Sequence, residues 1–397
     1  MINRPEYLKK LLAFKDNQLI KIVTGVRRCG KSTLFKLYQE ALLGRGVRTA
    51  QIQSINLEDV DNEPLLDYRT LHGHVKKRLV PGKWNYIFLD EIQNVANFEK
   101  AVRSLFDKGQ VDLYLTGSNS KLQSGEWATS LAGRYVDIHM LPLSFKEFVS
   151  AFPNPAGLEQ HYARYTRCSG FPHVLQLQEE NVREYLSGLY SSIVLKDVME
   201  NKKIREAGRL ERVIKFMAGN IGSETSVKKI SDTMTSDGAK ILPLTVESYL
   251  DGLRDSYILY RVDRHDVKGK KLLKTLNKYY LVDVGLRRLL FGDKKADTGH
   301  VLENVVYLEL LRRGCKVHVG KVDEKEVDFV AEGADGTAYY QVAETVRGGE
   351  TLARELAPLD AIRDHHPKFL LTLDYDCATH NGIRHVNALE WLMGRGV

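Results

Sequence analysis

The chain has 397 residues, enough for two or three domains that each bury a core without disulfide bonds or structural metal ions. Hydrophobic residues make up 43% and charged residues 27% of it, a composition that excludes disordered, collagen-like and disulfide-stapled proteins. The four cysteines lie far apart, and we find neither a signal peptide nor an apolar run long enough to cross a membrane. We therefore expect a cytoplasmic protein with no membrane partner.

The net charge is +7, and the basic excess is confined to one part of the chain. Residues 205–295 hold 19 Lys and Arg against 12 Asp and Glu, whereas the rest of the chain is balanced. This segment is where a polyanionic partner is predicted.

A strand, a glycine-containing loop and a helix are predicted near the N-terminus. Residues 19–24 have the composition of a short strand, and residues 33–43 that of a helix ended by Gly44. Between them, GVRRCGKS matches G-x-x-x-x-G-K-[ST] at every fixed position. Such a loop brings backbone N–H groups to phosphate oxygens, with a lysine on the β- and γ-phosphates and a hydroxyl on Mg²⁺. We predict a nucleotide site made by Gly25, Val26, Arg27, Arg28, Cys29, Gly30, Lys31, Ser32 and Thr33.

An acidic pair follows the second predicted strand, residues 85–91 (NYIFLDE). Ligands gather at the carboxyl ends of strands in parallel α/β sheets. We expect Asp90 to hold Mg²⁺ and Glu91 to orient or deprotonate the attacking water. Taken alone, such a pair is also compatible with a helix N-cap.

Three further predictions concern this site. The strand at 111–116 ends in GSNS, so that Thr116, Ser118 or Asn119 is placed to contact the γ-phosphate, unless these residues only form a polar turn. Arg134 is a candidate arginine finger, with a structural or surface arginine as the alternative. Cys29 lies among basic residues, so its thiol either has a lowered pKa and reacts selectively or is an inert residue that fills the loop.

These segments make the chain resemble bacterial and archaeal ATPases that join an AAA-type P-loop domain to a C-terminal nuclease-like domain of unassigned function. The resemblance rests on TGVRRCGKST (24–33), IFLDEIQ (87–93), YLTGSNS (114–120), LAGRY (131–135), LPLSFKEF (141–148), and later LEN, EVDF and YYQV. It implies ATP as the nucleotide, since the guanine-reading motif Asn-Lys-x-Asp does not occur. It also implies that the polar group after the third strand senses the γ-phosphate.

The middle of the chain has the element order of a winged helix-turn-helix. Helices are predicted at 209–218, 226–234 and 245–257, followed by strands at 258–262 and 279–282. The basic wing between Arg264 and Lys278 holds six basic residues and one acidic residue, Asp266. We expect it to contact the backbone of double-stranded DNA, the alternative being a solvated wing that packs domains together.

The C-terminal region has the layout of a restriction-endonuclease-like fold. A helix at 299–313 carries Glu303, a strand at 326–330 carries Asp328, and a strand at 338–342 carries Gln341. In such enzymes carboxylates hold Mg²⁺ and a lysine helps to activate water, but Ala343 stands in place of that lysine. We predict a vestigial metal site at Glu303, Asp328 and Gln341 without nuclease activity, because only Lys321 or Lys325 could substitute as the base.

Together these features predict an α/β protein with four regions: an AAA-type P-loop ATPase domain (1–150), a helical linker or lid (151–204), a winged-helix domain (205–295) and a nuclease-like domain (296–397). The predicted function is a Mg²⁺-dependent ATPase that acts as a nucleotide switch on DNA or a protein partner. Two alternatives stay open, an ATP-bound scaffold with little turnover and an ATP-regulated nuclease. Glu91 favours the switch over the scaffold, because a protein that only binds ATP needs no water-orienting carboxylate.

Overall fold

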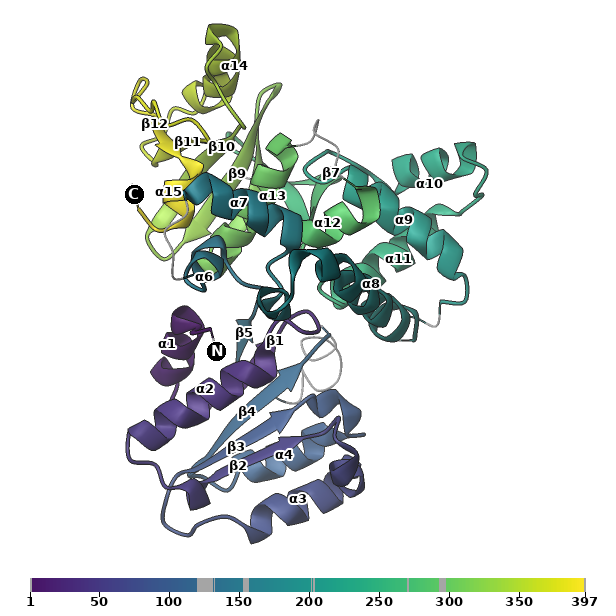
Figure 1. The fold of residues 1–397 in the computed structure, drawn as a ribbon, viewed down its shortest axis with the longest axis vertical. Helices are drawn as coiled ribbons and strands as arrows, with labels where there is room; N and C mark the ends of the chain where they lie inside the picture. The colour runs from purple at the N-terminus through teal and green to yellow at the C-terminus, as the bar shows by residue number, and fades with distance from the viewer. Residues whose placement is uncertain are drawn as a thin grey trace. The chain divides into compact units, whose positions relative to one another are not determined.

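A computed structural model describes residues 2–119, 131, 133–152, 157–200, 202, 204–269, 271–292 and 298–395 (Figure 1). The chain forms two compact units, one of residues 1–140 with 255–257 and the other of residues 141–254 with 258–397. Each unit has its own sheet. Within the described residues, the helices are too short or too polar to cross a membrane.

The sheet of the first unit is parallel, with the strand order β2-β3-β4-β1-β5 in the part of the chain that the structure describes. Its strands are β1 (Ile20–Thr24), β2 (Ile52–Asn56), β3 (Asn85–Asp90), β4 (Val111–Gly117) and β5 (Tyr135–His139). The helices of this unit are α1 (Pro5–Ala13), α2 (Lys31–Gly44), α3 (Tyr68–Lys77) and α4 (Phe98–Phe106). The strands predicted at 19–24, 85–91 and 111–116 and the helix after the glycine loop are therefore confirmed.

Helices cover both faces of this sheet, so its inner strands β1, β3 and β4 are buried on each side (Figure 1). On one face, Phe35 of α2 meets the ring of Phe88 edge-on at 5.1 Å, and Phe88 stacks on Tyr114 at 4.7 Å. The other face packs on α3 and α4 through Leu71, Val75, Val102 and Leu105. These two layers hold the carboxyl ends of the strands in fixed register beside the glycine loop.

The sheet of the second unit joins the predicted wing to the C-terminal region. In the described residues its order is β12-β11-β10-β9-β8-β6-β7. The antiparallel hairpin of β6 and β7 is attached through the parallel pairing of β6 with β8. The strands are β6 (Leu259–Asp266), β7 (Lys271–Leu281), β8 (Lys316–Val322), β9 (Lys325–Gly333), β10 (Gly336–Val342), β11 (Lys368–Thr372) and β12 (Arg384–Asn387).

The helices of the second unit include the three predicted before the hairpin. They are α6 (Phe145–Val149), α7 (Leu158–Cys168), α8 (Val182–Ser192), α9 (Ala207–Gly219), α10 (Val227–Ser236), α11 (Pro243–Asp255), α12 (Val284–Phe291), α13 (Thr298–Arg312), α14 (Gly349–Asp360) and α15 (Ala388–Leu392). The long helix α13 packs on β7, where Tyr307 stacks on Tyr280 at 4.5 Å. The Asn304 side chain also bonds both the N–H and the carbonyl of Leu281, each at 2.8 Å. Helix α13 and the hairpin therefore share one core.

Candidate nucleotide-binding site

The glycine loop lies between the end of β1 and the start of α2, and its shape requires two of its glycines. Gly25 has φ +148°, and a Cβ there would lie 2.1 Å from the carbonyl oxygen of Met140. Gly30 has φ +107° and caps α2 without a side-chain hydrogen bond. The first turn of α2 carries no acidic side chain, so no carboxylate of this turn competes with an anion for its free N–H groups and the positive end of the helix dipole.

Lys31 is held over this loop. Its Nζ donates to the carbonyl oxygens of Gly25 at 3.1 Å and Val26 at 3.4 Å, and lies 3.5 Å from Glu91 Oε1. The side chain is buried, although the ammonium is charged. A buried cation above a row of backbone N–H groups is an arrangement that accepts phosphate.

Thr116 connects the two residues of the acidic pair. Strand β4 lies between β1 and β3, so Thr116 is brought between the glycine loop and Asp90. Its hydroxyl donates to Asp90 Oδ1 and accepts the Glu91 N–H at 2.8 Å. This bond fixes Glu91 in a left-handed conformation with φ +54°. The Thr116 hydroxyl is thus engaged with the carboxylates.

Glu91 is oriented by a residue to which the sequence did not assign a role. The amide nitrogen of Gln93 donates to Glu91 Oε2 at 2.5 Å and lies 3.5 Å from Ser118 Oγ. Burial acts to raise the pKa of Glu91, but the Lys31 ammonium and the Gln93 and Ser118 hydrogen bonds outweigh it and lower that pKa. Glu91 is therefore a carboxylate at neutral pH. The only signal in the sequence was that Gln93 ends the segment IFLDEIQ.

Burial has the opposite outcome for Asp90. It raises the pKa of this carboxyl, against the hydrogen bonds from Ser32 and Thr116 that lower it. A divalent cation would stabilise the negative charge of Asp90 in this place.

The other predicted loop residues differ in exposure. Ser32 and Thr33 are exposed in the first turn of α2, and Arg28 is exposed with φ +65°. Arg27 forms an ion pair with Glu58. Val26 of the glycine loop is buried, and so are Ser118 and Asn119, which follow β4.

Arg134, the candidate arginine finger, does not lie near the glycine loop of its own chain, so the structure gives it no contact with this site in cis. Its carbonyl accepts the N–H of Ile20 at 2.8 Å, which places it beside the start of β1. Because β1 and β5 are parallel, the loop follows the opposite end of these strands, about 13 Å away at 3.3 Å per residue. Its guanidinium lies 3.9 Å from Asp107 instead.

The structure favours the interpretation of Cys29 as a residue that fills the loop. It is fully buried, and burial raises the pKa of its thiol, against the lowering effect of Lys31 and Arg4. Of the two alternatives for Cys29, a lowered pKa is the one that the structure does not support, because loss of solvent outweighs the nearby positive charge.

Carboxylates already neutralise part of the basic wing. Arg264 pairs with Glu224 at 2.6 Å, and Lys268 pairs with Asp323 at 2.5 Å. Lys278 is buried and is not available to phosphate. Lys270 lies outside the described residues.

The structure brings Glu303 and Asp328 together, and Lys278 of β7 lies beside them. Sequence reasoning counted this lysine as part of the wing and named Lys321 or Lys325 as the substitute base. Lys325 instead donates to the Ala357 carbonyl at 3.3 Å. No local pattern marks Lys278, because its partners are 25 or more residues away in the chain.

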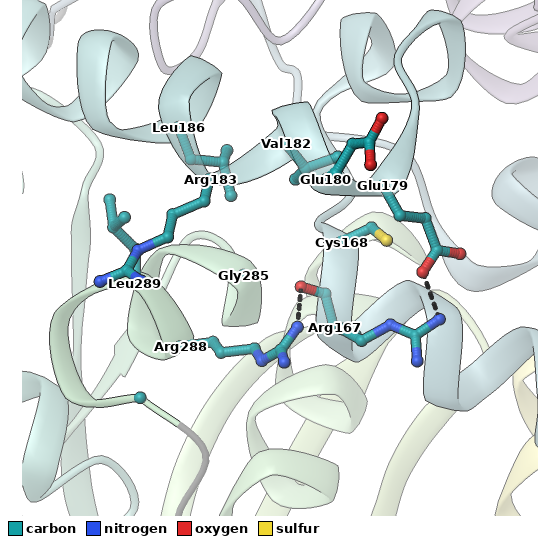
Figure 2. Close-up of a pocket in the computed structure, with 11 residues that line it drawn as sticks. Arg167, Cys168, Glu179, Glu180, Val182, Arg183, Leu186, Gly285, Arg288 and Leu289 are labelled. Atoms are coloured by element: carbon teal, nitrogen blue, oxygen red, sulfur yellow. Dashed lines mark hydrogen bonds and ion pairs between the residues drawn. The ribbon is translucent and has the colours of Figure 1, made fainter.

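A cavity of about 470 Å³ lies in the second unit, between α7, α8 and α12 (Figure 2). Arg167, Arg183 and Arg288 line it together with Glu179 and Glu180. Arg167 and Glu179 form an ion pair at 2.5 Å across one side, and Arg288 donates to the Arg167 carbonyl at 3.1 Å. Two of the three arginines that line the cavity, Arg167 and Arg288, are therefore bonded to other groups of the protein.

Family models match two parts of the chain. A family described as "AAA domain" matches residues 17–149, and a "Domain of unknown function (DUF8612)" matches residues 159–297. The solved structure of the Walker-type ATPase PABY2304 of Pyrococcus abyssi covers 73% of this chain and 96% of that chain, with 13% identity and a TM-score of 0.49.

Two proteins resemble the chain over most of its length. An uncharacterized protein of Haemophilus influenzae is 38% identical over 99% of both chains. The uncharacterized protein MJ1544 of Methanocaldococcus jannaschii is 31% identical, over 87% of this chain and 80% of that protein. The chain belongs to one family with these two proteins, and its residues 17–149 form an AAA-type P-loop domain.

Proposed function

We propose that the protein is a Mg²⁺-dependent ATPase that works as a nucleotide switch. One observation carries this proposal: Lys31 Nζ faces the Glu91 carboxylate at 3.5 Å, and Thr116 ties Asp90 and Glu91 together at the same edge of the sheet. A phosphate-binding cation and two oriented carboxylates are the parts that phosphoryl transfer to water requires.

The backbone of residues 25–33 and Lys31 would hold the phosphates of ATP. The hydroxyl of Ser32 and the carboxylate of Asp90 would hold Mg²⁺, because hard oxygen ligands suit this ion. Bound there, Mg²⁺ would neutralise charge on the phosphates.

Glu91 is the proposed base or water-orienting residue. Its lowered pKa keeps it ionised, so it can accept a hydrogen bond from the attacking water. Gln93 and Thr116 restrict its position, and both act through Glu91 as positioning residues.

The partner of the switch is proposed from the second unit. Helices α9, α10 and α11 and the hairpin of β6 and β7 support a winged helix that binds DNA or a protein. Because Arg264, Lys268 and Lys278 are paired to carboxylates, these three residues would contribute less to DNA contacts than the sequence predicts. A cytoplasmic location stays a prediction from the sequence.

The test measures binding of a labelled ATP analogue and release of phosphate, with and without duplex DNA. Lys31→Ala should weaken binding at least about tenfold, because the phosphate charges lose their buried counter-ion. Lys36→Ala is the matched control, since Lys36 is exposed on the same helix. Unchanged affinity in Lys31→Ala would overturn the nucleotide site.

A second pair of variants separates the switch from the scaffold. Glu91→Gln should bind ATP normally and lose turnover, whereas Glu40→Gln, an exposed carboxylate on α2, should behave as wild type. Wild-type protein that binds ATP without releasing phosphate would favour the scaffold. DNA cleavage that requires ATP would favour the nuclease.

A further inference from the structure

Three carboxylates surround one lysine in the second unit. Lys278 Nζ lies 2.8 Å from Glu326 Oε1, 3.0 Å from Glu303 Oε1 and 3.3 Å from Asp328 Oδ1. These residues come from β7, β9 and α13, which lie together in the same unit. The Lys278 side chain is 5% exposed, so the ammonium depends on these three partners.

The restriction-endonuclease-like layout implies a Mg²⁺ ion at Glu303, Asp328 and Gln341, and these residues do not fit one. A Mg²⁺ ion would need oxygen ligands at about 2.1 Å, which is the space that the ammonium takes between Glu303 and Asp328. Gln341 uses its oxygen to accept the Asp328 N–H at 3.3 Å and its nitrogen to bond Glu355 at 2.9 Å. The third ligand is therefore committed elsewhere.

Other groups also bond the two carboxylates. The Tyr280 hydroxyl donates to Glu303 Oε1 at 2.5 Å, and the Val342 N–H donates to Asp328 Oδ2 at 2.9 Å. Gly222 closes the cluster, because a Cβ at this position would lie 2.8 Å from Glu303 Oε2. Among the described residues, no group of three or more His, Cys, Asp or Glu side chains is arranged to hold a metal ion.

We propose that the Lys278 ammonium takes the place of the divalent cation, so that the C-terminal region is held together by an internal cation and needs no metal. An ammonium has three N–H donors, and here each has one carboxylate partner. The contacts attach β7 of the wing hairpin to α13 and β9. The nuclease-like fold then serves as a rigid base for the wing, without hydrolytic chemistry.

The charge balance of the cluster agrees with this role. Three carboxylates against one ammonium leave an excess of negative charge. Burial, followed by the charge of Glu303, raises the pKa of Asp328 to about 7. Burial also raises the pKa of Glu326.

The test compares thermal unfolding without nucleotide, in EDTA and in Mn²⁺, for wild type, Lys278→Ala and Lys268→Ala. Wild type should show the same Tm in both conditions. Lys278→Ala should lose roughly 10 °C, because removing one partner of a buried ion pair leaves uncompensated charge. Mn²⁺ should then recover part of this loss, because the exposed carboxylates become ligands. Lys268→Ala, which removes an exposed lysine of the same hairpin, should leave the Tm unchanged.

Two outcomes would overturn the proposal. The first is a rise of the wild-type Tm in Mn²⁺ that Asp328→Asn abolishes, since it would show a metal at this cluster. The second is a Lys278→Ala protein as stable as wild type. If Lys278→Ala does not fold, Mn²⁺ is titrated into wild type and Asp328→Asn by calorimetry. Equal heats of binding in the two proteins support the internal cation. A heat of binding that is lost in Asp328→Asn refutes it. None of these measurements depends on ATP hydrolysis.

Discussion

Thr116 provides the sharpest test of how the acidic pair is held. Its hydroxyl is fully buried, donates to Asp90 and accepts the Glu91 N–H at 2.8 Å. Thr116→Val keeps the shape and volume of the side chain but removes both bonds. The Glu91 N–H then loses its acceptor, and Glu91 loses the bond that fixes its left-handed backbone.

The size of the effect follows from these two bonds. A buried donor without a partner costs about 1–3 kcal/mol. At roughly 2–4 °C per kcal/mol, the Tm of the first unit should fall by about 2–12 °C. ATP affinity should change little, because Lys31 and the glycine loop are untouched. Turnover should fall about 10- to 100-fold, the usual effect of displacing a catalytic group by about 1 Å.

The assay is phosphate release together with thermal unfolding and binding of a labelled ATP analogue. Thr225→Val is the matched control. Thr225 is equally buried, but its hydroxyl has no hydrogen-bond partner among the described residues, so its removal should be neutral or stabilising. A Thr116→Val protein with wild-type turnover and wild-type Tm would refute the reasoning.

Three further predictions concern His139, Lys21 and Cys29 of the first unit. Burial lowers the pKa of His139 from 6.5 to about 4, so the unfolded state binds the proton at a higher pH than the folded state does. The free energy of unfolding should therefore fall as the pH drops from 6.5 to 4. The Tm measured across this window should fall less steeply in His139→Gln than in wild type. Lys21→Met should cost about 3–5 kcal/mol in denaturant unfolding, because buried Asp112 loses its ion-pair partner, and a second change, Asp112→Asn, should recover part of the loss. Native protein should be alkylated first at exposed Cys377 and last at buried Cys29, and the reverse order by mass spectrometry would contradict the burial argument.

Some of the site was predictable from the sequence, because it depends on neighbours along the chain. The strand, loop and helix around Gly25 and Lys31 are adjacent segments, and their spacing alone places backbone N–H groups and an ammonium on one loop. Asp90 and Glu91 end a strand, and parallel strands bring their carboxyl ends to one edge of a sheet.

The tertiary structure decided every feature that depends on which strands are neighbours. The order β3-β4-β1 makes Thr116 the link between Asp90 and Glu91, and the parallel pairing of β1 with β5 places Arg134 at the opposite edge of the sheet from the glycine loop. The sequence groups Lys278 with the basic residues of the wing. In the fold, β7 lies beside α13 and β9, and three carboxylates surround this lysine. Composition and spacing report local conformation, whereas these contacts join residues 25 to 115 positions apart, and only the packing of the sheets selects them.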